Sequence, residues 1–368
     1  MMKKEKPMKK TNRLLLLGAI FSFLLLPMTV FADSITPETY AATIGVGDSV
    51  TITKTVTIDT AVTSAKVDVF FLFDTTGSMG GLISSAQSKA AEILTATSAL
   101  GDVAFGVGTY EDFATSPWGG AGDFPFEMKQ NLTTNSAAAN TAIQGLGLGW
   151  GNDGPESNLY GLEQVAEQAT WRTDSTRIVV WFGDYNSHDP EDTPGYPGPS
   201  LATTIAALNA EGIVVEAVDM GYLDGDGEAT AIAAATGGSV LNMGSSATNI
   251  VSVIENAIDD VFATYEEVSL QVVGADNVAV SYAPLAYTGA FTREAPATFT
   301  FDVTFTGMTE GVDEIEIHAL VDGGIVATEH DTITVIGGGT GDPVPEPATL
   351  LLLSTGLLGL AGARRKKK

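Results

Sequence analysis

The stretch that most constrains the fold is residues 67–80, VDVFFLFDTTGSMG. Its first seven residues are apolar except for one Asp, and they are rich in β-branched and aromatic side chains. A run of this length is too short for a helix of its own and is typical of a strand buried on both faces. Such strands belong to sheets that are covered on both sides, so the stretch predicts an α/β fold.

Three oxygen-bearing side chains follow this strand at alternate positions: Asp74, Thr76 and Ser78. Gly77 lets the backbone turn sharply, so these side chains can converge beyond the carboxyl end of the strand, where open α/β sheets bind ligands. A set of oxygen ligands suits a hard cation, Mg²⁺ before Mn²⁺ or Ca²⁺. The alternative is a Ser/Thr turn that caps the next helix.

The sequence DTTGSM between a hydrophobic strand and a helix resembles the D-x-S-x-S motif of von Willebrand factor A-type domains, which forms a metal-ion-dependent adhesion site. Thr76 takes the place of the middle Ser and keeps the hydroxyl. Residues 150–158, WGNDGPESN, are similar to the acidic D-x-P-E loop of the integrin β version, with Glu156 in the metal-ligand position. Residues 181–189, WFGDYNSHD, are similar to the loop after the central strand, with Asp184 as the last carboxylate.

This resemblance implies a metal-dependent adhesion or interaction protein that is not an enzyme. Thr76, Ser78 and Glu156 would bind the cation directly, and Asp74 and Asp184 would act through water. An open coordination position would accept a carboxylate from a partner protein or an acidic polysaccharide. One alternative is a structural surface protein in which the metal only stabilises the fold. Another is a hydrolase using Ser78 and His188, but no G-x-S-x-G elbow surrounds Ser78.

Other acidic positions offer weaker candidates for a cation. Gly80 and Gly81 stand where integrin β subunits carry paired Asp, so their adjacent regulatory metal site is not expected. Glu111 and Asp112 follow the strand predicted over 103–110 and are expected in a solvated turn. The segment LDGDGE, with Asp224, Asp226 and Glu228, resembles the first part of a calcium loop without its distal Glu. A plain Asp/Gly turn is the main interpretation there, with calcium as the alternative.

Strands and helices alternate across residues 66–266, the predicted von Willebrand A-type domain, and this pattern predicts a doubly wound, mostly parallel sheet. Predicted strands after the first cover 103–110, an edge strand at 126–132, 177–183 and 213–219. Predicted helices cover 82–100, 136–146, 157–170, 201–211, 228–235 and 249–265. The loop at 185–199 is long and rich in Pro, Gly and acidic residues, and long loops inside compact domains are usually functional.

Residues 33–65 and 267–337 differ in pattern from the α/β domain. In both segments, apolar and polar residues alternate in short stretches that are separated by Gly, Asp and Pro. They predict an antiparallel β-sandwich. Too few strands lie in 267–337 to form two sheets. Adding 51–58 would complete the sandwich, with the α/β domain inserted between its strands.

The two ends of the chain carry sorting signals. Residues 1–32 combine a basic segment, an apolar core and a small-residue cleavage site, which together indicate a secretory signal peptide. Residues 338–344 are a Gly-rich linker. Residues 345–368 carry Pro345, Glu346 and Pro347, then an apolar run and a basic end, and they resemble the PEP-CTERM sorting signal.

That resemblance implies an exosortase partner that cuts near Pro345 while the apolar run lies transiently in the inner membrane. The family occurs in Gram-negative bacteria that export polysaccharide, which implies a cell-surface or extracellular-matrix location. The alternative is an ordinary membrane anchor.

The composition indicates how the fold is held together and which partners are not expected. The chain has no Cys, so a hydrophobic core and not disulfides must hold the fold. The formal net charge is -27, and the basic clusters lie in the two terminal segments that are expected to be removed. Such an acidic surface repels phosphate backbones, so nucleic acid is not an expected partner. The same surface attracts divalent cations and keeps the protein soluble.

Overall fold

A single six-stranded sheet forms the centre of the α/β domain. The computed structural model describes residues 32–244 and 247–337, and the strand order of this sheet is β6-β5-β4-β7-β8-β9. The strands are β4 (Ala65–Asp74), β5 (Gly101–Tyr110), β6 (Glu127–Thr133), β7 (Thr176–Tyr185), β8 (Ile213–Tyr222) and β9 (Val240–Asn242). All pairs are parallel except β5 with β6, which is antiparallel at the edge. The predicted fold class, a doubly wound and mostly parallel sheet, is confirmed.

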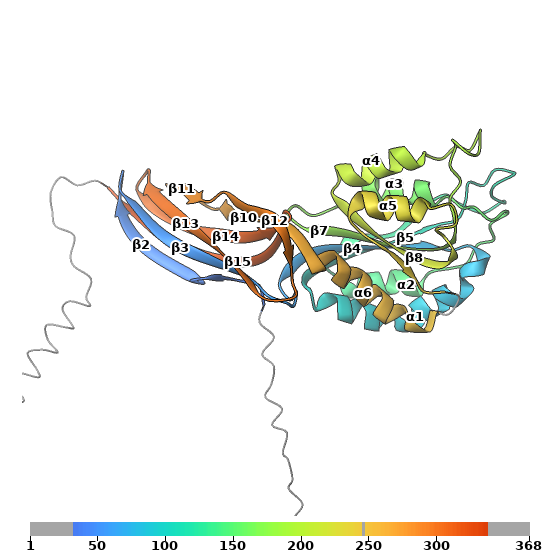
Figure 1. Ribbon diagram of the computed structural model, residues 1–368, viewed down its shortest axis with the longest axis horizontal. Helices are drawn as coiled ribbons and strands as arrows, with labels where there is room; N and C mark the ends of the chain where they lie inside the picture. The colour runs from blue at the N-terminus through green and yellow to red at the C-terminus, as the bar shows by residue number, and fades with distance from the viewer. Residues whose placement is uncertain (1–31, 245–246, 338–368) are drawn as a thin grey trace, which may run out of the picture. The chain divides into compact units, whose positions relative to one another are not determined.

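Helices cover both faces of this sheet (Figure 1). One face carries α1 (Gly80–Ser98), α2 (Ser136–Gln144) and α6 (Ile250–Ala263), and the other carries α3 (Asn158–Gln168), α4 (Leu201–Ala210) and α5 (Glu228–Thr236). Phe71 and Phe73 belong to the core beneath α1, whereas Phe70 and Leu72 belong to the core beneath α3. The unbroken apolar run of β4 exists because successive side chains enter two different cores.

The Asp inside that apolar run is paired. Asp68 is fully buried, and its carboxylate accepts hydrogen bonds from the Arg172 backbone N–H at 2.7 Å, from Arg172 Nε at 2.5 Å and from Ser175 Oγ at 3.0 Å. The same guanidinium donates to the carbonyl oxygens of Val67 and Asp102. One side chain therefore neutralises the buried charge and ties the start of β4 to the start of β5.

The remaining strands form two sheets that share an apolar core, and every strand pair in them is antiparallel except β15 with β2. One sheet has the order β1-β3-β13-β11 and the other β12-β10-β14-β15-β2. Their bounds are β1 (Ser34–Thr36), β2 (Thr39–Gly45), β3 (Ser49–Ile58), β10 (Thr264–Val273), β11 (Val278–Ala283), β12 (Ala286–Thr292), β13 (Ala297–Gly307), β14 (Gly311–Val321) and β15 (Gly324–Ile336). β3 pairs with β13, and β2 runs parallel to β15, so strands from both ends of the described chain lie in each sheet.

Several details differ from the sequence expectations. Three strands, β1, β2 and β3, precede the α/β domain, and β9 had no counterpart among the strands predicted for that domain. β10 begins at Thr264, inside the range assigned to the α/β domain. The predicted signal peptide, linker and sorting signal lie outside the described residues. Within the described residues, no helix combines the length and apolar character that a membrane crossing needs.

Candidate functional site

The candidate metal site lies at the carboxyl ends of β4 and β7. Asp74 is the last residue of β4 and is fully buried. Its Oδ1 accepts hydrogen bonds from the Thr76 backbone N–H at 2.8 Å and from Thr76 Oγ1 at 2.7 Å. Since the Thr76 hydroxyl gives its proton to Asp74, its lone pairs remain available to a cation.

Ser78 places a second hydroxyl next to that of Thr76. Its Oγ lies 3.4 Å from Thr76 Oγ1. The carboxylate of Asp184, the residue before the end of β7, lies close enough to the Ser78 hydroxyl to interact with it. Two hydroxyls thus lie side by side, and the Thr76 hydroxyl donates to the Asp74 carboxylate behind it.

Glu156 reaches the site because its loop is clamped to the loop after β7. The Glu156 N–H donates to the Asn186 carbonyl at 3.1 Å, and the His188 N–H donates to the Glu156 carbonyl at 3.0 Å. Gly151 has a φ of +62°, and a Cβ there would lie 2.9 Å from Glu156 Oε1 and 3.3 Å from the Thr76 methyl. A glycine is therefore required where Glu156 and Thr76 approach each other.

All five residues predicted from the sequence are thereby brought together. We refer to them as the cation cluster: Asp74, Thr76, Ser78, Glu156 and Asp184. Burial raises the pKa of Asp74 to about 7 and, together with the charge of Asp74, the pKa of Glu156 to about 10. Burial also raises the pKa of Asp184, and the Ser78 hydrogen bond partly offsets it. These carboxylates are held close together, and none of them forms an ion pair with a described residue.

Two buried oxygens of the cation cluster have no hydrogen-bond partner among the described residues. Asp74 Oδ2 and Glu156 Oε2 are buried and accept no hydrogen bond from any described residue. An unpaired buried carboxylate oxygen costs free energy unless a donor or a cation satisfies it. Oxygen ligands, two prearranged hydroxyls and two unsatisfied carboxylate oxygens fit a hard divalent cation.

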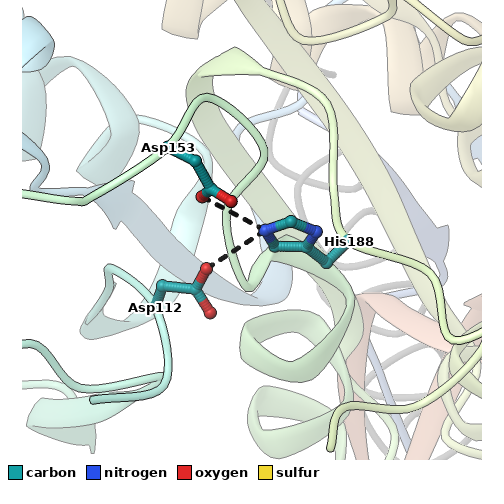
Figure 2. A group of neighbouring side chains, drawn as sticks. All are labelled: Asp112, Asp153 and His188. Carbon is teal, nitrogen blue, oxygen red and sulfur yellow. Dashed lines mark hydrogen bonds and ion pairs between the residues drawn. The ribbon is translucent and has the colours of Figure 1, made fainter. Parts of the chain in front are cut away.

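A second cluster adjoins the first. Asp112, Asp153 and His188 present ligand atoms that all lie within 4.8 Å of one another. Figure 2 shows both carboxylates directed at the same ring nitrogen, and His188 Nε2 lies 3.4 Å from Asp112 Oδ2 and 3.2 Å from Asp153 Oδ1. The expectation of a solvated turn at Asp112 was wrong, because this side chain is completely buried. Tyr196 covers it and donates to its Oδ1 at 2.8 Å.

Sequence reasoning did not group these three residues. Asp153 stands inside the D-x-P-E loop, and His188 stands four residues after Asp184, so both belonged to segments already singled out. His188 makes a hydrogen bond with Asp153 of the neighbouring loop. Because Ser78 contacts Thr76 and Asp184, whereas His188 contacts Asp112 and Asp153, the two belong to different clusters.

The LDGDGE segment behaves as a turn. Asp224 accepts hydrogen bonds from the backbone N–H and hydroxyl of Thr230 in α5. Asp226 Oδ2 accepts from the Asn186 side chain at 2.6 Å, and Glu228 Oε2 accepts from the Ser187 N–H at 2.7 Å. Each of these carboxylates is engaged by a different protein donor, as expected for the turn interpretation.

Large apolar side chains are exposed beside the cation cluster. Trp150 is 87% exposed and Leu148 is 51% exposed. Their loop lies against the turn after β4, since the Gly149 N–H donates to the Thr75 carbonyl at 2.8 Å. Tyr185 packs on Tyr222 with ring centroids 5.2 Å apart. Exposed aromatic residues at a site rim are typical of contact surfaces.

Comparison with known proteins assigns the tail and gives fold-level neighbours. A family model described as the PEP-CTERM protein-sorting motif matches residues 343–366, which confirms the predicted sorting signal. Among curated proteins, the alpha-protein kinase vwkA of Dictyostelium discoideum is 28% identical over 165 residues, which cover 40% of this chain and only 24% of that protein's length.

The solved structures that align with the chain include von Willebrand factor type A proteins. One from Catenulispora acidiphila has a TM-score of 0.39 and 15% identity over 84% of this chain and 75% of that chain. Proximal thread matrix protein 1 from the mussel byssus has a TM-score of 0.40 and 15% identity over 57% and 48%. A further structure of that protein, described with a zinc-occupied MIDAS motif, has a TM-score of 0.40 and 16% identity over 57% and 47%.

The sorting motif and the strand order of the chain carry the assignment together. This chain is an exported protein that bears a PEP-CTERM protein-sorting motif behind a doubly wound α/β domain resembling the von Willebrand factor A type.

Proposed function

We propose that this protein binds a partner at the cell surface or in the extracellular matrix of a Gram-negative bacterium, through a divalent cation held by the cation cluster. The observation that carries the proposal is a pair of buried oxygens, Asp74 Oδ2 and Glu156 Oε2, that have no hydrogen-bond partner among the described residues. They lie beside the Thr76 hydroxyl, which donates its proton to Asp74, and its neighbour, the Ser78 hydroxyl. A protein interior rarely leaves such atoms unsatisfied without a functional reason.

Mg²⁺ is the first choice of cation, with Mn²⁺ and Ca²⁺ as alternatives, because every donor is oxygen. Thr76, Ser78 and Glu156 would hold it directly, and Asp74 and Asp184 would hold the hydroxyls and water around it. The bound cation would supply an open coordination position for a carboxylate of a partner protein or of an acidic polysaccharide. Trp150, exposed on the adjoining loop, would add apolar contact area.

The proposed role is binding and not catalysis. A Ser–His pair would be needed for the hydrolase alternative, and here Ser78 and His188 have different contacts. In the alternative, the cation only stabilises the fold. Removing the metal would then unfold the domain, and partner binding would be lost only because the fold is lost.

The first experiment measures cation binding. Calorimetry with Mg²⁺ and Mn²⁺ on the exported protein is expected to give one site, and Asp74→Ala and Ser78→Ala are expected to weaken it by about tenfold or more. Ser88→Ala is the matched control, since this exposed residue of α1 bonds only to the carbonyl of Ser85. Parent-like binding by both site variants would show that the assignment is wrong.

The second experiment measures partner binding. Immobilised protein is tested against purified acidic extracellular polysaccharide and against a carboxylate-bearing peptide, in Mg²⁺ and in EDTA. The proposal expects binding that EDTA abolishes while circular dichroism stays unchanged, and that Trp150→Ala weakens. Leu285→Ala, which alters another exposed apolar residue in the sandwich, should have no effect. Binding that persists in EDTA would contradict the proposal, and loss of the fold in EDTA would favour the structural role.

A further inference from the structure

In the β-sandwich, Lys54 occupies a strand position that faces the apolar core. In β3, alternate residues face the core, and Lys54 is in phase with Val56 and Ile58. Its side chain is completely buried. Lysine is almost never fully buried unless it is paired, so this position calls for a specific partner.

Two carboxyl groups meet this lysine from the opposite sheet. Glu329 and Asp331 occupy core-facing positions of β15, in phase with Ile333. Lys54 Nζ lies 2.6 Å from Glu329 Oε1 and 2.8 Å from Asp331 Oδ1, and the two carboxyl side chains are 1% and 0% exposed. We call these three residues the amine–carboxyl triad.

Apolar side chains surround the triad. Phe301 stands directly across from Lys54 on β13, and Ile315 and Ile317 stand across from Asp331 and Glu329 on β14. All three of these neighbours are at most 1% exposed. Cross-strand partners point to the same face of a sheet, so they enclose the triad and exclude water from it.

The charges of the triad do not balance in its ionised form. One ammonium faces two carboxylates, which leaves a net negative charge in an apolar interior. Glu329 Oε2 and Asp331 Oδ2 also accept no hydrogen bond from any described residue. Burial raises the pKa of Glu329 to about 7, partly offset by Lys54 and reinforced by Asp331. Transfer of one proton from the amine to a carboxylate would remove two charges from this apolar interior.

We propose that Lys54 and Asp331 condense spontaneously into an intramolecular amide that links the two sheets of the sandwich. The lone pair of the neutral Lys54 amine attacks Cγ of the protonated Asp331 carboxyl group, a new N–C bond forms, and the C–OH bond of Asp331 breaks. The nitrogen loses one proton, the departing hydroxide takes up one proton, and one water molecule leaves. No oxidant, reductant or activated co-reactant is needed.

Glu329 is the proton carrier for this step. It lies next to the amine, so it can accept the proton that the nitrogen loses and deliver it to the leaving oxygen. Asp331 is the acceptor because its Oδ1 makes a hydrogen bond with Nζ, which places Cγ beside the nucleophile. The product replaces the ion pair by a neutral amide and leaves Glu329 as the one carboxyl group of the triad.

The bond would join residues 277 positions apart in sequence. Because β3 precedes the α/β domain and β15 follows it, the whole domain with the cation cluster would lie inside a covalent ring. An exported protein without cysteine would thereby gain the crosslink that disulfides provide elsewhere.

Intact-mass spectrometry of the folded, exported protein tests the proposal, with its ends defined from the same sample. The wild type is expected to be lighter than its sequence by one water, and to migrate faster on a denaturing gel than a variant without the crosslink. Lys54→Arg keeps the positive charge but removes the nucleophile, so it should show the full mass. Lys89→Arg is the matched control, because Lys89 makes an exposed ion pair of 2.6 Å with Glu92 and should leave the water loss unchanged.

Three further results make the test independent of any one variant. Asp331→Asn should keep the fast mobility but lose ammonia in place of water, whereas Asp331→Ala should lose neither. Glu329→Gln should slow the bond strongly in protein of native circular dichroism. Fragmentation should locate the link between Lys54 and Asp331. Full mass in folded wild-type protein, water loss that persists in Lys54→Arg, or a link to any other residue would overturn the proposal.

Discussion

The buried acidic side chains at the two ends of β4 differ in how their charges are compensated. The carboxylate of Asp68 receives three hydrogen bonds and the charge of Arg172, so its burial is fully compensated. Asp74 Oδ2 and Glu156 Oε2 receive none from the described residues. The first arrangement is what structure alone requires, whereas the second is what a cation site requires. The buried charge at the start of β4 is therefore compensated by the protein itself, whereas the oxygens at its end are left for a ligand.

Glu216 gives a pH-dependent prediction away from the cation cluster. This residue of β8 is buried, and burial raises its pKa to about 7 despite hydrogen bonds from Ser239. The folded state holds the proton more tightly than the unfolded state, so the stabilisation is complete below about pH 4.5 and is lost as the pH rises through about 7.

Glu216→Gln stays neutral, so its stability relative to the wild type should increase between pH 5 and pH 8. Urea unfolding at these two pH values measures this difference. Glu294→Gln, in an exposed turn of the sandwich, should show no comparable change. A constant difference between Glu216→Gln and the wild type would refute the assignment of the titration to Glu216.

At the scale of elements, β4 is fixed at its amino end by one side chain. Arg172 joins Asp68 of β4 to the carbonyl and carboxylate of Asp102 in β5. The opposite end of β4 delivers the candidate metal ligands. The strand is thus anchored at the end away from the site, which gives the turn after Asp74 a fixed support.

Arg172→Ala should therefore destabilise the protein by about 3 kcal/mol, because it leaves the Asp68 carboxylate buried and uncompensated. Arg177→Ala is the matched control, since Arg177 pairs at 2.8 Å with the exposed Glu211. Its ion pair should be worth about 1 kcal/mol or less. Urea unfolding measures both variants. Equal losses from the two would contradict the importance given to the buried pair.

At the scale of the whole molecule, both ends of the described chain contribute to the same sheets. β3 pairs with β13 over ten residues, from Ser49 with Thr306 to Ile58 with Ala297. β2 likewise pairs with β15. Neither terminal segment contains a complete sheet, so the sandwich depends on chain segments separated by the whole α/β domain.

A fragment of residues 267–337 should consequently fail to fold alone, because it exposes the edge of β13 that β3 normally covers. A fragment of residues 64–264 retains all six strands and helices of the α/β domain and should unfold cooperatively. Circular dichroism with thermal unfolding distinguishes the two. Cooperative unfolding of the 267–337 fragment would show that its own strands suffice.

The sequence by itself determined the features that depend on neighbouring residues. The apolar run and the turn chemistry of DTTGSM fixed β4 and placed Asp74, Thr76 and Ser78 together, because all of them lie within one turn of chain. Glu156 and Asp184 followed from resemblance to known loops and not from spacing. The tail was identified in the same way and matches a sorting motif.

Only the tertiary structure decided which distant residues meet. The phase of Lys54 among apolar positions is visible in the sequence, but its partners lie 275 and 277 positions away on another sheet. Asp112, Asp153 and His188 meet because three loops converge at one edge of the sheet. The alternation of apolar and polar residues predicts which side chains of a strand are buried, because successive side chains point to opposite faces of the sheet. This alternation does not predict which residue lies on the opposite side of the core, because strand order and register determine that contact.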